Sequence, residues 1–335
     1  MIVRRMGPAR VIALLFAEIL ALGAHCERPT AAAADEDARL SRARRLLEQQ
    51  KPGDAEGVLT AYLAQHPDSA DAHFLLGAAL FRQVQEDARS APVSSASSRD
   101  AKIKASLAEF TEGAKYRAPS AADLKIVALD YVLLNDYANA DKWLTKMLEW
   151  APDDGEGWYY LGRTKYNENR FAEAVEAFQR CLKLDPQNVK AEDNLGLSYA
   201  GLGRHEEAMA AYKNAIAWQQ ESAAKNPGPY IDMGSLLLDL NQSADAVWYL
   251  REALKISPAE FKAHELLGKA YSRLGQLSEA QRELEKAIRL APEVASMHCM
   301  LGPIYRRQGM LDKAKVELER CAALTGTRSS RETPR

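Results

Sequence analysis

The sequence predicts an all-α solenoid built from repeated pairs of helices, and three observations lead to this expectation. The chain of 335 residues is rich in Ala, Leu, Glu, Arg and Lys, which favour helices over sheets. Prolines recur at steps of 33 or 34 residues, as in Pro119, Pro152 and Pro186 and again in Pro258 and Pro292. In step with them stand Leu-Gly or Met-Gly pairs at 76–77, 161–162, 195–196, 233–234, 267–268 and 301–302. Such a period is typical of proteins whose units stack on their neighbours.

The spacing within each period resembles the tetratricopeptide repeat. One set of signature positions holds Trp158, Leu161, Gly162, Ala174, Phe178 and Pro186, and a second holds Leu267, Gly268, Tyr271, Ala280, Leu284 and Pro292. The resemblance extends over nearly the whole chain after residue 35. It implies a right-handed α-α superhelical solenoid of about eight helix-turn-helix units, at residues 36–69, 70–120, 121–154, 155–188, 189–222, 227–260, 261–294 and 295–328.

Small residues and prolines at fixed positions explain how such a unit folds. Glycines such as Gly268 let the second helix of a unit approach closely, and Ala280 is expected to face this glycine. Gly203, Gly275 and Gly309 stand at the turn between the two helices, where a positive φ is often needed. Each proline ends a second helix and starts the next unit. No unit can bury its own apolar face, so stacking is obligatory.

Three segments depart from the regular pattern. The first unit carries Arg39 and Arg42 where apolar residues are usual, which suits a terminal cap. Residues 89–100 are rich in serine and contain Pro92, so the sequence predicts an inserted mobile loop between the helices of the second unit. Residues 329–335 are polar and are expected to form a disordered tail.

The N-terminal segment has the composition of an export signal. Arg4, Arg5 and Arg10 precede a short apolar run at residues 11–23, and small residues follow. This order is typical of a secretory signal peptide, and the run is too short for a comfortable transmembrane helix. The sequence therefore predicts a signal peptide and linker at 1–34 and an exported protein of the periplasm or envelope. Gly23 and His25 do not match a bacterial lipobox, which argues against lipidation at the nearby cysteine.

The remaining cysteines and the histidines give no chemical motif. Cys181, Cys299 and Cys321 are an odd set without metal-ligand spacing, and we expect three small side chains packed in the array. His264-Glu265 begins a zinc-protease motif, but Gly268 stands where its second histidine is required. The sequence also holds neither a phosphate-binding loop nor a nucleophile elbow. We therefore expect a protein that is not an enzyme and has no cofactor or metal.

The resemblance places the binding surface in the concave groove, which the first helices of the units line. The candidate groove residues follow from repeat phase: Phe74, Phe81, Leu129, Val132, Leu133, Tyr159, Arg163, Tyr166, Asn167, Leu197, Ile231, Leu238, Lys262, Lys269, Arg273, Arg306 and Arg307. Leu129, Val132, Leu133, Tyr159 and Tyr166 are expected to form one apolar sector, and such exposed patches usually mark interfaces.

Charge along the array refines the expected partner. The net charge is −2, too small to indicate nucleic acid, and membrane contact is expected only through an uncleaved N-terminal segment. Residues 121–260 carry a net charge of −8, whereas residues 261–328 carry +4. We therefore expect a protein or peptide partner with an apolar anchor and an acidic end. The sequence favours a protein-binding scaffold or adaptor in the bacterial envelope. The alternative is a non-catalytic regulatory or substrate-delivery subunit of an envelope enzyme or export complex.

Overall fold

The computed structural model describes residues 31–90, 96–220, 222 and 224–329, and within them the fold is all-α. Residues 1–30 of the predicted signal peptide lie outside the described residues, and 31–34 form the start of the first labelled helix. The described helices are α2 (Ala31–Glu48), α3 (Pro52–Leu63), α4 (Ala70–Ser90), α5 (Ala96–Gly113), α6 (Ala121–Leu133), α7 (Tyr137–Trp150), α8 (Gly155–Asn167), α9 (Phe171–Leu184), α10 (Val189–Gly201), α11 (His205–Trp218), α12 (Gly228–Asp239), α13 (Ser243–Ile256), α14 (Phe261–Arg273), α15 (Leu277–Leu290), α16 (Ala295–Arg307) and α17 (Leu311–Ser329).

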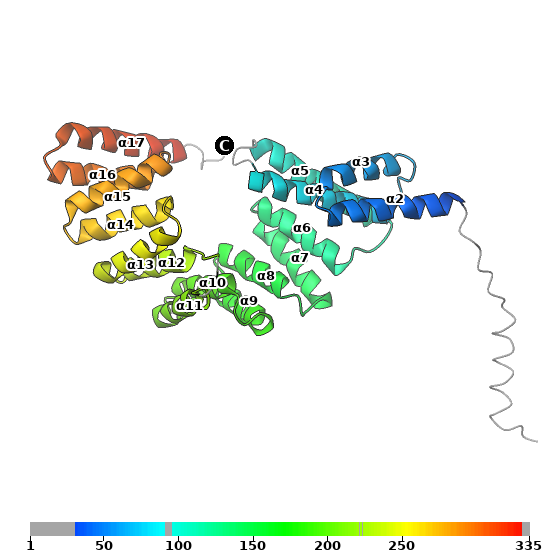
Figure 1. The fold of residues 1–335 in the computed structure, drawn as a ribbon, viewed down its shortest axis with the longest axis horizontal. Helices are drawn as coiled ribbons and strands as arrows, with labels where there is room; N and C mark the ends of the chain where they lie inside the picture. The colour runs from blue at the N-terminus through cyan, green and yellow to red at the C-terminus, as the bar shows by residue number, and fades with distance from the viewer. Residues whose placement is uncertain (1–30, 91–95, 221, 223, 330–335) are drawn as a thin grey trace, which may run out of the picture.

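The helices form successive antiparallel pairs, and the pairs stack into a curved array (Figure 1). Each first helix of a pair contacts the first helix of the next pair, from α2 and α4 through to α14 and α16. No such contact joins consecutive second helices of the described residues. The first helices therefore line the concave side, and the second helices fan out on the convex side. The predicted solenoid fold is confirmed.

A left-handed backbone residue ends the first helix of each regular pair. Gly203, Gly275 and Gly309 have φ values of 72°, 77° and 78°, as the sequence predicts. The other pairs use Gln50, Asn135, Asn169 and Asn241 at the same position, with φ between 56° and 61°. Asparagine tolerates this conformation better than most residues with a Cβ. The turn therefore keeps one geometry although its residue type varies.

Each repeat glycine lies under a large side chain of its partner helix. A Cβ built on Gly268 would come within 2.5 Å of Leu284 Cγ, and one on Gly162 within 2.7 Å of Phe178 Cε1. Ala280 is fully buried one helical turn before Leu284, and in the last pair the equivalent Ala314 carbonyl oxygen lies 3.4 Å from a Cβ built on Gly302. That Ala280 faces Gly268 stays a prediction, and Leu284 fills the space directly above the glycine.

A polar bridge recurs at the start of several first helices. His264 joins α14 to two elements, with Nδ1 2.7 Å from Glu283 Oε2 and Nε2 3.1 Å from the Pro258 carbonyl oxygen. His73 and His298 make the same pair of contacts, with Glu109 and Pro67 and with Glu317 and Pro292. Trp158 occupies the same position and donates its indole N–H to the Pro152 carbonyl at 2.7 Å. These histidines hold helices together, and the described residues contain no group of three or more potential metal ligands.

The serine-rich insertion mostly lengthens two helices, contrary to the predicted loop. Helix α4 continues to Ser90 and α5 begins at Ala96, so that only 91–95 lie outside the described residues. The added turns pack against each other, because Val84 and Ile103 are buried and Lys102 Nζ lies 2.8 Å from Asp87 Oδ2. Serines in the first turn of α5 cost little, because the N–H groups there have no partner within the helix.

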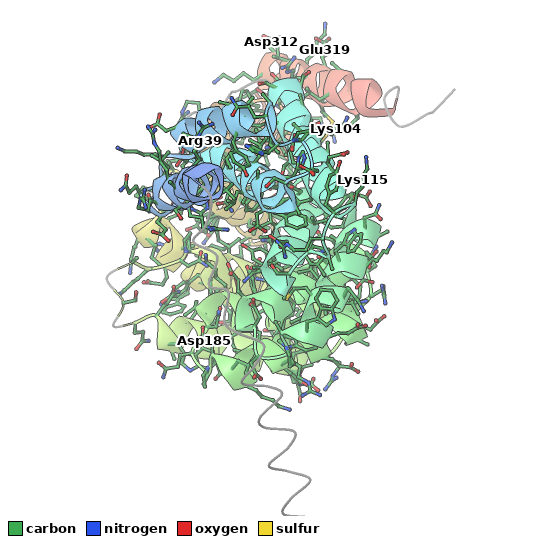
Figure 2. All side chains as sticks on the ribbon, turned by 90° about the vertical axis from the view of Figure 1, so that its right-hand side faces the viewer. Arg39, Lys104, Lys115, Asp185, Asp312 and Glu319 are labelled. Carbon is green, nitrogen blue, oxygen red and sulfur yellow. A yellow bond between two sulfur atoms is a disulfide. The ribbon has the colours of Figure 1, made fainter. Side chains whose placement is uncertain are left out.

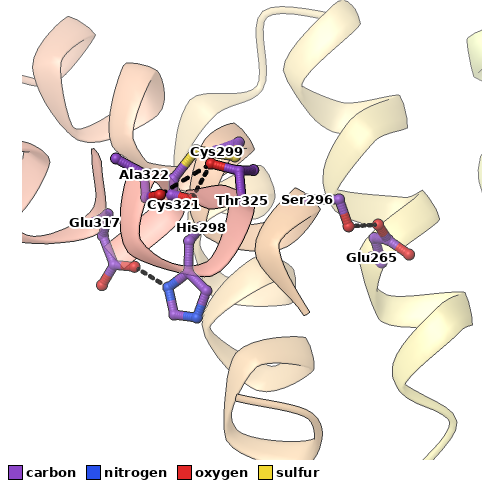
Figure 3. Close-up of a disulfide and its surroundings, with 8 residues drawn as sticks. All are labelled: Glu265, Ser296, His298, Cys299, Glu317, Cys321, Ala322 and Thr325. Carbon is purple, nitrogen blue, oxygen red and sulfur yellow. Dashed lines mark hydrogen bonds and ion pairs between the residues drawn. A yellow bond between two sulfur atoms is a disulfide. The ribbon is translucent and has the colours of Figure 1, made fainter. Parts of the chain in front are cut away.

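The last pair contains a disulfide that the sequence analysis did not predict (Figure 3). Cys299 on α16 and Cys321 on α17 are bonded, with Cα atoms 5.0 Å apart, and Cys181 is free and buried. The expectation of three unbonded cysteines is wrong because the 22-residue separation places two of them on facing sides of antiparallel helices. Ser329, assigned to the tail, is the last residue of α17, and 330–335 lie outside the described residues.

Candidate groove site

A pocket of about 380 Å³ opens where α4, α6 and α8 meet on the concave side. It brings together six of the predicted groove residues, namely Phe81, Leu129, Val132, Leu133, Arg163 and Asn167. The structure adds six residues that the sequence analysis missed, namely Gln85, Arg99, Asn135, Tyr137, Tyr160 and Thr164. Three successive first helices thus contribute to one cavity, as repeat stacking requires.

The walls of the pocket are partly apolar and partly polar. Leu129, Val132 and Leu133 are half-buried on α6, and their apolar surface forms one wall. At the opposite side the Thr164 side chain is buried, and its hydroxyl has no hydrogen-bond partner among the described residues. Asn167 Nδ2 donates to the Arg163 carbonyl at 2.8 Å, which fixes the amide at the rim. The apolar side chains offer contact area to a bound segment, and the polar groups beside them can fix its orientation.

Tyr159 and Tyr166 lie outside this pocket, although the sequence analysis placed them in its apolar sector. Both pack against the buried cluster that contains Phe178, and the Tyr159 and Phe178 ring centroids are 6.1 Å apart. Its neighbour Tyr160 takes the place in the pocket. Either tyrosine fits the repeat pattern equally well, because adjacent helix positions point about 100° apart and both flank the groove.

Four other apolar candidates belong to the core of the array. Phe74 is buried against Phe110 and Val127, and the Arg117 guanidinium lies 4.9 Å from its ring centroid. Ile231 and Leu238 are buried in the cluster formed by α12 and its neighbours, and Leu197 packs against the same cluster. These side chains stabilise stacking and leave little apolar surface for a partner.

Most of the predicted basic residues are already paired within the array. Lys262 Nζ lies 2.8 Å from Glu265 Oε2, and Lys269 Nζ lies 3.8 Å from Asp239 Oδ1. The Arg273 guanidinium donates to the Leu238 carbonyl at the end of α12, where a cation is favoured by the helix dipole.

Arg306 and Arg307 are exposed and form no ion pair within the described part of the chain. The free basic surface is therefore smaller than the sequence composition indicates. Charged side chains also cover the outer surface, among them those of Arg39, Lys104, Lys115 and Asp185 (Figure 2). Among the described residues no helix is both long and apolar enough to span a bilayer.

The fold and the groove together define a helical-repeat protein with a concave groove. Models of the tetratricopeptide repeat match residues 40–91, 155–188, 193–222, 228–260, 261–294 and 295–327, more than half of the chain. The chain belongs to the tetratricopeptide-repeat proteins, and it is a scaffold of the kind that binds proteins or peptides. Its matched repeats are typical of non-catalytic proteins.

Relatives share only parts of their length with this chain. A human PEX5-related protein is 47% identical over 66 residues, which are 19% of this chain and 10% of that protein. The peroxisomal targeting signal receptor of Kluyveromyces lactis is 30% identical over 96 residues, 29% of this chain and 17% of that protein. Protein FlbA of Caulobacter vibrioides is 24% identical over 181 residues, 44% of this chain and 29% of that protein.

Solved structures share the fold at low sequence identity. A tetratricopeptide repeat protein from Parabacteroides merdae aligns over 80% of this chain and 98% of its own, with a TM-score of 0.59 and 16% identity. PilW, a type IV pilus biogenesis factor, aligns over 61% of this chain and 92% of its own, with a TM-score of 0.55 and 20% identity.

Proposed function

We propose that this protein is a scaffold or adaptor of the bacterial cell envelope that binds a segment of another protein in its concave groove. The pocket between α4, α6 and α8 carries the proposal. Its walls combine apolar and polar side chains, they include Thr164 with its unpaired hydroxyl, and residues from three units converge on it. A side chain of an extended or helical segment would fill this pocket as the anchor, because buried apolar anchors supply most of the affinity of such interfaces.

Two features support the envelope location. The basic and apolar order of the first 23 residues is typical of an export signal. The Cys299–Cys321 bond is of a kind that persists in oxidising compartments such as the periplasm and is rare in a reducing cytosol. The relatives named as targeting signal receptors agree with recognition of short protein segments, although the shared region is small.

Site-specific photocrosslinking in cells tests the groove. A photoreactive amino acid at Asn167, on the pocket rim, should crosslink a partner that the same label at Arg180, exposed on the convex helix α9, does not capture. Leu133→Glu places a charge in the pocket wall and should abolish the crosslink from Asn167. Capture at Arg180 that persists in Leu133→Glu, with none at Asn167, would place the interface on the convex face.

The location is tested separately by fractionation and intact-mass measurement. We expect the mature protein in the periplasmic or membrane fraction, with an N-terminus between Glu27 and Glu36 and a mass two hydrogens below that of the reduced form. A full-length, fully reduced protein in the cytosolic fraction would overturn the envelope location and leave the groove proposal intact.

A further inference from the structure

Two carboxyl groups on neighbouring first helices form a second feature of the concave side. Asp193 on α10 and Asp232 on α12 interact electrostatically, and Asp193 is only 6% exposed. The Asp193 Oδ1 atom has no hydrogen-bond partner in the described part of the chain. Gly228, at the start of α12, makes room for this carboxyl, since a Cβ there would lie 3.0 Å from Asp193 Oδ2. A buried carboxyl without a partner is costly and calls for an explanation.

Phenol groups lie within electrostatic reach of this acidic pair. Tyr212 on α11 is buried and interacts with both carboxyls, and Tyr166 on α8 interacts with Asp232. Neither phenol forms a hydrogen bond within the described residues. Tyr159 also lies within electrostatic reach of Asp193. Two carboxyls and the Tyr212 hydroxyl therefore present three hydrogen-bond acceptors that the array itself does not use.

Among the described residues, Lys262 is the basic side chain whose charge lowers the pKa of Asp232. Its ammonium instead contacts Glu265 at 2.8 Å, and its side chain is half exposed. Burial raises the pKa of Asp193, the charge of Asp232 raises it further, and burial also raises the pKa of Asp232. Because no cation contacts the pair among the described residues, burial favours its protonated form.

We propose that Asp193, Asp232 and Tyr212 form a subsite of the groove for a lysine side chain of the bound partner. This inference rests on the proposed peptide-binding role of the groove. An ammonium group has three donors in a compact head, which match the three unused acceptors, whereas a guanidinium presents five donors in a planar fork. The subsite lies on α10 and α12, the two first helices that follow α8. It is therefore further along the groove than the pocket between α4, α6 and α8. A partner segment would therefore carry an apolar anchor and, further along, a lysine.

The probe for this test is N-acetyl-lysine methylamide, compared with its norleucine and arginine counterparts, which share the backbone and differ in the head group. In NMR titrations of the full chain we expect the lysine probe to shift resonances of α8, α10 and α12, with at least about tenfold weaker binding of norleucine. Asp232→Asn should weaken binding of the lysine probe by about tenfold or more, whereas the exposed control Asp312→Asn should not change it.

The titrating proton gives a second readout that needs no variant. The lysine ammonium enters as a cation and displaces the proton of the pair, so binding should release protons and should strengthen as the pH rises from 6 towards 9. Calorimetry in two buffers of different ionisation enthalpy measures this release. Equal binding of norleucine, shifts confined to other helices, unchanged affinity in Asp232→Asn, or no proton release would each overturn the subsite. Leu133→Glu lies in the pocket between α4, α6 and α8 and should leave probe binding unchanged. The experiment therefore separates a failure of the lysine subsite from a failure of the pocket proposal.

Discussion

The seventh and eighth helix pairs follow the same plan but have different numbers of neighbours. Pair α14–α15 lies between two pairs, and Leu284 above its glycine is completely buried. Within the described residues, pair α16–α17 has a neighbouring pair on one side only, and the corresponding Leu318 is 38% exposed. The second of these pairs alone contains the Cys299–Cys321 bond. At the corresponding positions of pair α14–α15 stand Glu265 and Ala287.

This difference shows what a neighbour contributes to a repeat. In an array the stability of a unit is the sum of its own packing and the interfaces on either side. Within the described residues the last pair has one such interface, and the disulfide ties its two helices together directly (Figure 3). Ser296 donates to Glu265 Oε1 at 2.6 Å and helps to fix the last pair on the one before it. We infer that the bond replaces part of the second interface that an inner pair has.

The largest effect should come from a charge placed in pair α14–α15, which has a neighbouring pair on each side. Ala280→Asp would overfill a fully buried site and leave a carboxylate without a counterion. We expect a loss of about 4 kcal/mol or more in the free energy of unfolding. Ala314→Asp, at the same position of the last pair, should cost about half as much.

Urea denaturation at pH 7 measures both changes. Val316→Asp, at a position 61% exposed, serves as the control and should stay within about 0.5 kcal/mol of the parent. Equal losses for Ala280→Asp and Ala314→Asp would contradict the view that a neighbour makes the difference.

Much of this fold follows from the sequence because the determinants are local and periodic. The positive-φ position, the glycine under a large side chain and the proline after each second helix all recur at one spacing, so each unit predicts the next. The insertion at 89–100 could not be placed in this way, because its length is unique in the chain. Its helices depend on buried side chains such as Val84 and Ile103, which no repeat position specifies.

The candidate site was less accessible to sequence analysis. Repeat phase identifies which helix face points inward, and six residues of the pocket were found in this way. Repeat phase does not tell which inward residue lines a cavity between neighbouring helices. It therefore predicts Tyr159 as a groove residue, whereas Tyr160 lines the pocket. Nor does it identify side chains whose charges are already satisfied, as in Arg273. These outcomes depend on the exact rotation between pairs, which packing sets.

The second effect compares two equivalent leucines. Leu284→Ala removes a completely buried side chain above Gly268 and should cost about 3 kcal/mol, since the cavity is closed on both sides. Leu318→Ala leaves a space open to solvent and should cost about 1 kcal/mol. Chemical denaturation of both variants, with circular dichroism as the readout, measures the difference. A larger loss for Leu318 would mean that another element covers α17 in solution.

The third effect concerns the disulfide itself. Cys321→Ser removes a bond that closes a 22-residue separation, and we expect a loss of about 2 kcal/mol. Because the last pair has one neighbour, the loss should appear as local opening. Hydrogen exchange should accelerate in α16 and α17 while α10 and α12 keep their protection. Equal exchange in the variant and the parent would show that stacking alone holds this pair. Cys181→Ser provides a control that removes a thiol without removing a bond.

The smallest effect compares the two histidine bridges. Glu283 forms ion pairs with more side chains than Glu317 does, since it contacts His264, Lys286 and Arg282. The Glu283 side chain is 7% exposed, and that of Glu317 is 19% exposed. Burial tends to raise the pKa of Glu283, but the hydrogen bonds from His264 and Lys286 outweigh this and hold it below the ordinary value of 4.5. A lowered pKa in the folded state means that the ionised carboxylate stabilises the fold above pH 4.5, and that this contribution is lost as the pH falls further.

Glu283→Gln should therefore destabilise the array at pH 7, and by more than Glu317→Gln, because it leaves three basic partners without their carboxylate. The deficit of Glu283→Gln relative to the parent should shrink as the pH is lowered from 4.5 towards 3, where the parent carboxylate takes up its own proton. Denaturation curves at a series of pH values measure the deficit. A deficit that stays constant down to pH 3 would show that Glu283 acts through its shape and hydrogen bonds, and that its charge contributes nothing to holding α14 against α15.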